Sequence, residues 1–150
     1  MHDAVVIALT SPVLVGIYKD GELVERFESG RQSSDALPEL FERILEKYTL
    51  SHLIYANGPG SFMAIKIAYL FLKTLSIVLN IRLLAADAFY FNGNRPLKAV
   101  GKLHFVKMAS TITTQKFETP VAANFRLPSQ LNLNDFSDDA LPYYGIGAVG

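Results

Sequence analysis

The first half of the chain alternates short apolar runs with segments of helical periodicity. Residues 4–9 and 13–18 are apolar and rich in β-branched side chains, and residues 23–28 alternate apolar with polar positions after Asp20 and Gly21. An Asp-Gly pair between two such runs favours a two-residue hairpin, because glycine accepts the positive φ of a type I′ turn. The pattern predicts a three-stranded antiparallel meander at the start of the chain.

Helices and buried strands are expected after the meander. Apolar residues recur at helical spacing between Leu37 and Tyr48, with Asp35 near the expected N-terminus and Pro38 in the first turn, where a missing N–H costs little. Residues 51–57 and 81–86 are typical of buried strands and flank a long apolar helix at 61–79. The order βββαβαβ predicts one mixed sheet with helices packed on it.

The pattern changes near residue 95. Residues 97–108 and 112–118 are typical of strands, with no convincing helix between them, and the segment after Leu127 is rich in Pro, Asn, Asp and Gly. We therefore predict an α/β lobe at residues 1–95, followed by a truncated second lobe and an irregular tail at residues 96–150.

The helix at 61–79 is apolar on nearly every side. At 100° per residue, one broad arc is expected to face the core. That arc holds Ile67, Ala68, Phe71, Leu72, Leu75, Val78 and Leu79. The opposite side is too apolar for a face meant only for water, so it predicts a partner interface, although burial inside the domain remains an alternative. The predicted interface residues are Met63, Lys66, Tyr69, Leu70, Lys73 and Ile77.

Composition bears on the solubility of the protein and on its location in the cell. Each lysine of this helix would cost about 2.5–3.5 kcal/mol near the middle of a membrane, so a membrane span is not expected. The sequence has no cysteine, which excludes disulfides, thiolate zinc sites and cysteine nucleophiles. The N-terminus lacks the basic region of a secretory signal. We expect a soluble, cytoplasmic protein.

The net charge is zero, but it is unevenly spread. Residues 1–60 carry nine acids against five bases, and residues 82–126 carry seven bases against two acids. The basic stretch could lie near nucleic acid, yet it shows no regular alternation of basic and aromatic side chains, so an ordinary solvated surface is the favoured interpretation.

Candidate catalytic groups are scattered. His2, His52 and His104 are far apart and none has a second ligand at helical spacing, so no metal site is expected. Ser61 has no recognisable histidine partner, and Asp138 with Asp139 fits a solvated pair in a polar tail. No Walker A lysine is present. We expect neither a cofactor nor an enzyme.

A glycine-rich turn joins the predicted strand at 51–57 to the apolar helix. Its residues are Gly58, Pro59, Gly60, Ser61 and Phe62. Such a turn could cradle a phosphate at the helix N-terminus, but Ala64 and Ala68 stand where glycines would let the backbone approach one closely. A structural turn is the favoured interpretation.

This turn, the helix after it and the following "IRLLAADAF" resemble the corresponding segment of the TsaB (YeaZ) family. The resemblance covers residues 1–92 and returns weakly at "LPYYGIG". It implies an actin-like ATPase (ribonuclease H-like) N-lobe. It also implies a non-catalytic subunit of the bacterial tRNA N6-threonylcarbamoyladenosine machinery, which scaffolds or activates the catalytic subunit TsaD together with the ATPase TsaE. The tRNA is then reached only through the complex, and a homodimer is an alternative pairing.

The chain departs from the family pattern at several positions. Ala8 stands where an actin-like fold usually has a metal-directed aspartate, and Gln32 stands roughly where relatives carry a histidine. Residues 63–66 replace the family's Thr-Gly-Leu-Arg. Two alternatives therefore stay open: an actin-like nucleotide-binding enzyme or peptidase-like protein, and a homodimeric scaffold that has lost the tRNA-modification role.

Overall fold

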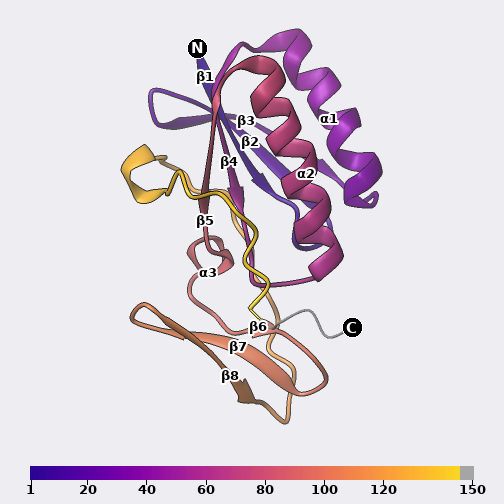
Figure 1. Ribbon diagram of the computed structural model, residues 1–150, viewed down its shortest axis with the longest axis vertical. Coiled ribbons are helices and arrows are strands. Elements are labelled where there is room, and N and C mark those ends of the chain that lie inside the picture. The colour runs from indigo at the N-terminus through magenta and orange to yellow at the C-terminus, as the bar shows by residue number, and fades with distance from the viewer. Residues whose placement is uncertain (146–150) are drawn as a thin grey trace.

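Five strands form a mixed sheet in the order β3-β2-β1-β4-β5 (Figure 1). The computed structural model describes residues 1–145. The strands are β1 His2–Ile7, β2 Val13–Lys19, β3 Glu22–Ser29, β4 Leu50–Ala56 and β5 Arg82–Ala86. β1 to β3 pair antiparallel, whereas β1, β4 and β5 run parallel. Both the predicted meander and the predicted mixed sheet are confirmed.

The β2–β3 hairpin turns at the predicted dipeptide. Asp20 and Gly21 have φ values of 51° and 82°, both in the left-handed region that this tight turn requires. A Cβ on Gly21 would also lie 3.0 Å from the carbonyl oxygen of Leu131, because the C-terminal tail crosses the hairpin here.

Two long helices, α1 Ser33–Lys47 and α2 Phe62–Leu79, lie side by side on one face of the sheet (Figure 1). They cover the side chains of Val6, Val15 and Leu53, and the rings of Phe41 and Phe71 meet between the helices at 5.7 Å. α1 begins at Ser33, two residues before the expected start. Pro38 therefore lies in the second turn and not in the first, as the sequence had suggested.

The other face of the sheet is covered by the tail and by α3 Ala88–Phe91, a short helix that the sequence pattern did not predict. The buried side chains of Val5, Ile7 and Ile54 pack against this layer. Its residues are Phe91, Phe125, Leu127, Leu131, Leu133 and Phe136. The tail has little regular structure, as predicted, apart from the 3₁₀ turn Leu133–Asp135. It is nevertheless a full layer of the fold.

Backbone and side-chain hydrogen bonds hold this layer in place. Ser137 and Ala85 exchange backbone bonds of 2.8 and 2.9 Å along β5. The Tyr18 hydroxyl donates to the Pro128 carbonyl at 2.6 Å, and the Tyr55 hydroxyl donates to the carbonyl of Ala140 from the opposite face of the sheet. Buried tyrosines thus anchor both ends of the tail.

A second sheet, in the order β6-β7-β8, lies below the first in Figure 1. Its strands are β6 Leu97–Lys98, β7 Leu103–Met108 and β8 Thr111–Lys116. The predicted single strand at 97–108 is wrong, because the chain reverses between β6 and β7 and Ala99 donates back to the Leu103 carbonyl at 2.9 Å. The division of the chain at residue 95 stays a prediction. The last residues of the predicted second segment, 146–150, lie outside the part of the chain that the structure describes.

Alkaline pH tests the role of the buried tyrosines. Burial raises the pKa of Tyr18 and Tyr55 above the ordinary value of 10.0, so the folded protein holds both hydroxyls in the neutral form. Their stabilisation is complete below pH 10 and is lost as the pH rises toward the folded-state pKa values.

We therefore expect the melting temperature to fall steadily above about pH 10. The fall should be shallower in a Tyr18→Phe, Tyr55→Phe double variant, which starts from a lower stability because two hydrogen bonds are missing. An equally steep decline in the double variant, measured by circular dichroism, would assign the alkaline transition to other groups.

Candidate partner interface

The outer side of α2 is apolar and solvent-exposed. Met63 is 60% exposed, Leu70 53% and Ile77 69%, and Lys66 and Lys73 are exposed beside them. Tyr69 differs from the other predicted interface residues, because it is half-buried and its ring lies 6.4 Å from that of Tyr55. Five of the six predicted interface residues thus lie on one free surface.

The core-facing side of α2 is rotated from the predicted arc. The buried residues are Ile65, Ala68, Leu72 and Ser76, a stripe at helical spacing. Val78, predicted to face the core, is 73% exposed, and Ile65, which was not placed there, is fully buried. The rotation arises because α1 packs against one flank of α2, at Phe71, and moves the contact with the sheet toward Ile65.

Phe62 and Val78 extend the exposed side beyond the residues that the sequence indicated. Phe62 is 45% exposed, and its ring stacks on Tyr144 at 4.3 Å. We call Phe62, Met63, Leu70, Ile77 and Val78, together with Lys66 and Lys73, the α2 outer face. A helical wheel centred on Ile65 would have placed Val78 on this side, but not Phe62, which is only about 60° from Ile65 and is exposed at the start of the helix.

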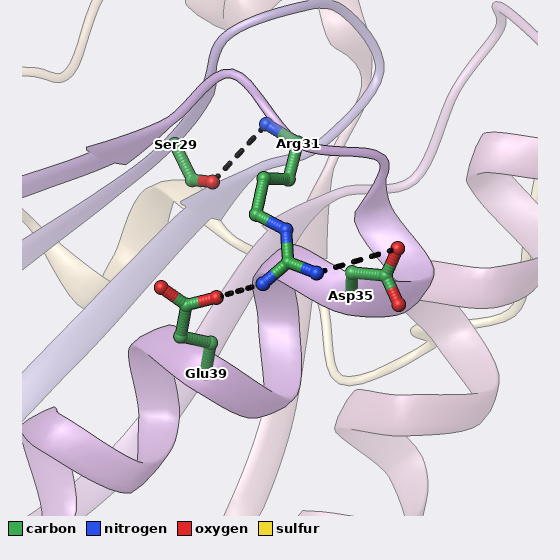
Figure 2. A network of polar contacts seen from close by, with 4 residues as sticks. All are labelled: Ser29, Arg31, Asp35 and Glu39. Atoms are coloured by element: carbon green, nitrogen blue, oxygen red, sulfur yellow. Dashed lines mark hydrogen bonds and ion pairs between the residues drawn. The ribbon is translucent and has the colours of Figure 1, made fainter.

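The neighbouring surface of α1 is acidic, with Glu39, Glu42 and Glu46 exposed beside Leu45. At the start of α1, the Arg31 guanidinium pairs with the carboxylates of Asp35 and Glu39, and the Arg31 backbone N–H donates to Ser29 Oγ at 3.2 Å (Figure 2). These side chains are about half exposed, so the pairs contribute little to stability and mainly orient the loop between β3 and α1.

α2 is the one helix in residues 1–145 that is long and apolar enough to cross a membrane by length and composition. Only 22% of it is buried inside the fold. The same low burial leaves the outer face exposed to solvent.

The glycine turn before α2 is held by the tail. The Tyr143 N–H donates to the Asn57 carbonyl at 2.8 Å, and the Asn57 side chain donates to the Leu141 carbonyl at 3.0 Å. Gly58 has a φ of 116°, and a Cβ there would lie 1.9 Å from the Tyr143 oxygen. Ser61 Oγ accepts from the Ala64 N–H at 3.4 Å and so caps α2. These contacts support a structural turn.

Three of the other candidate groups, His52, His104 and Asp138, have polar partners in the fold. His52 Nδ1 lies 2.8 Å from Asp3 Oδ1, which supports a satisfied boundary histidine, and buried His104 accepts from the Val121 N–H at 3.3 Å. Asp138 pairs with Arg82 at 3.1 Å. No group of three potential metal ligands lies together within residues 1–145.

A hollow of about 780 Å³ lies at the carboxyl ends of β4 and β5, next to the second sheet. Its polar groups bond one another. Asp87 pairs with Lys107 and accepts from the Tyr90 N–H, and the Tyr90 hydroxyl donates to Asp135 at 3.1 Å. Burial and the Asp135 carboxylate raise the pKa of Tyr90 to about 12. The residues that line the hollow thus link the two sheets. The Tyr90 hydroxyl keeps its proton over the physiological pH range.

Four bases of the basic stretch are also paired with acids. Besides Arg82 and Lys107, Lys102 and Lys116 pair with Glu118 at 2.6 and 3.4 Å. This pairing supports a solvated surface in preference to a phosphate-binding one.

The two glycines of the turn give a matched test. We expect Gly58→Ala to lower the free energy of unfolding by about 2 kcal/mol or more, because it combines a strained positive φ with a backbone clash. Gly60→Ala is the control, since its Cβ would meet Leu9 at an ordinary 3.7 Å. Urea titrations that rank the two variants equally would contradict the clamped turn.

The chain is similar to known proteins in its fold but hardly in its sequence. No protein-family model and no curated protein sequence matches the chain. The structure matches "YeaZ from Pseudomonas aeruginosa" with a TM-score of 0.60 at 13% identity, over 80% of this chain and 70% of that one. It also matches an uncharacterized protein with similarity to peptidase YeaZ from Pseudomonas aeruginosa, with a TM-score of 0.61 at 14% identity, over 81% and 69% of the two chains. The chain therefore has a YeaZ (TsaB)-like fold.

Proposed function

We propose that this protein is a non-catalytic subunit of the bacterial tRNA N6-threonylcarbamoyladenosine machinery. In this proposal it binds a TsaD-like catalytic subunit through the α2 outer face and the exposed side of α1, and a TsaE-like ATPase completes the assembly. The five-stranded lobe is an actin-like N-lobe and the three-stranded sheet is a reduced second lobe. The setting is the cytoplasm, and tRNA is reached through the complex.

The observation that carries the proposal is the exposure of the α2 outer face. Monomeric soluble proteins rarely leave a large contiguous apolar surface in water, and such surfaces mark interaction sites. Burying one large apolar side chain contributes about 1.5–3 kcal/mol, so Met63, Leu70 and Ile77 together could supply much of the affinity of a specific complex.

The charges favour a partner with an acidic surface. α2 carries Lys66 and Lys73 and no acidic residue, so a facing carboxylate would complement it. The exposed acids of α1 supply such a surface on a second copy of this chain, which supports a homodimer as the second candidate. The nucleotide-binding and peptidase-like alternatives have less support, since the tail packs directly over Gly58.

Charge substitution on the α2 outer face tests the proposal. In the free chain, Leu70→Glu places a carboxylate in water between Lys66 and Lys73, at spacings that allow favourable pairs. In a docked interface that carboxylate would be desolvated among apolar groups, which costs several kcal/mol, whereas each pair with a neighbouring lysine returns only about 0.2–0.5 kcal/mol. We expect Leu70→Glu and Ile77→Glu to weaken TsaD binding by roughly a hundredfold or more, as measured by calorimetry with the purified subunits.

Two controls separate docking from folding. Val24→Glu changes a similarly exposed apolar residue on β3 and should leave binding intact. Leu72→Glu changes a fully buried residue and should unfold the chain. If Leu70→Glu lowers the melting temperature as severely as Leu72→Glu, or leaves binding unchanged, the α2 outer face is not the interface.

Charge reversal in the basic stretch tests whether these lysines contact tRNA directly. We expect Lys98→Glu with Lys102→Glu to leave the tRNA affinity of the reconstituted complex and its salt dependence unchanged. If these lysines bound phosphates, the slope of log affinity against log salt would fall by about one unit per lost contact.

A further inference from the structure

The edges of the two sheets differ in how they are protected. β5 is covered along its outer side by the tail at Ser137, and β6 is only two residues long. β3 bridges Gln130 at its first residue, and four of its eight residues are charged. Coverage, shortness and charge are the usual means by which proteins prevent edge-to-edge pairing.

β8 has none of these protections over most of its length. It pairs with β7 on one side, and no other strand of residues 1–145 lies along its outer edge (Figure 1). Residues 111–115 are uncharged and exposed except for half-buried Ile112, and three of the five are threonines. Lys116 is the only charge, and it already pairs with Glu118. This composition favours strand pairing.

The hydrogen-bond pattern identifies which β8 groups are free. Phe117 donates its N–H to the Lys102 carbonyl at 2.9 Å, and the β7–β8 register continues this pairing along the strands. Because hydrogen-bonded and non-bonded pairs alternate in an antiparallel ladder, Thr111, Thr113 and Gln115 face β7. The backbone N–H and C=O groups of Ile112, Thr114 and Lys116 therefore point outward.

We propose that β8 pairs antiparallel with β8 of a second copy of this chain, with Thr114 on the two-fold axis. The outward-facing residues are spaced symmetrically about Thr114. In this register Thr114 faces Thr114 of the second copy, and Ile112 faces Lys116. All outward groups of both strands are then satisfied, by roughly six backbone hydrogen bonds.

The positions of the Lys116 charges and the closed form of the assembly both favour a second copy of this chain as the partner of β8. The two Lys116 side chains would lie four residues apart along the joined strands, roughly 13 Å, so they do not oppose each other. Pairing consumes the β8 edge of both copies and leaves the two-residue β6 strands at the ends of the joined sheet. The assembly is therefore a closed dimer and not a fibre.

This dimer is independent of the proposed function. In Figure 1, α2 lies above the second sheet and β8 lies at the bottom of the molecule, so one chain can use both surfaces. Leu70→Glu should therefore leave the β8 dimer intact.

Sedimentation equilibrium of the full chain with Thr114→Pro tests the pairing. Proline removes an N–H that points away from β7, which edge strands tolerate, so the monomer should keep its melting temperature. We expect the dimer dissociation constant to rise at least tenfold, whereas Thr114→Val, which keeps the N–H, should dimerise like the unchanged chain. An unchanged chain that stays monomeric at its highest soluble concentration, or a proline variant that dimerises equally well, would overturn the proposal.

Cysteine cross-linking tests the register. The sequence has no cysteine, so a single introduced thiol can link only to its counterpart in another copy. Facing residues of a hydrogen-bonded pair have Cα atoms about 5.5 Å apart, within disulfide reach, so Thr114→Cys should form a linked dimer under mild oxidation. Thr111→Cys is the control, because its counterpart would lie roughly 20 Å away. Equal linking of the two variants would reject this register.

Discussion

The central sheet is apolar on both faces, and the rest of the fold depends on this constraint. α1 and α2 cover only the face that carries Val6, Val15 and Leu53. The opposite face, with Val5, Ile7 and Ile54, would stand in water if the chain ended after the second sheet. Burial of apolar surface is the dominant favourable term in folding, so the tail returns across the sheet and supplies the third layer with only one short 3₁₀ turn of its own.

The returning tail also fixes the position of α2. The backbone N–H of Tyr143 donates to the Asn57 carbonyl, and the Asn57 side chain donates to the Leu141 carbonyl. These bonds hold the tail so close to Gly58 that no side chain would fit there. The chain therefore leaves β4 and enters α2 with one fixed angle between the strand and the helix. Tyr144 then stacks on Phe62 in the first turn of the helix. The surface that we propose as a docking site is thus held by residues more than 60 positions away in the chain.

The two sheets use their surfaces differently. The five-stranded sheet hides its edges with the tail and with charged side chains, and its covering helix α2 keeps an apolar side free. The three-stranded sheet leaves six residues of β8 along an open edge. One surface offers apolar side chains and the other offers backbone hydrogen bonds, so they suit different kinds of contact and need not compete.

The sequence by itself determined the five strands and two long helices of residues 1–86 and the glycine at the β2–β3 hairpin, because these follow from the local spacing of apolar residues and the φ that a turn requires. It also placed Met63, Leu70 and Ile77 on the free side of α2. It could not place Val78, Ile65 or the break between β6 and β7, since the rotation of α2 depends on the packing of Phe71 against α1 and the break depends on pairing with β7. Only the tertiary structure decided that a tail without periodicity is a layer of the core, because its contacts join residues that local pattern cannot relate.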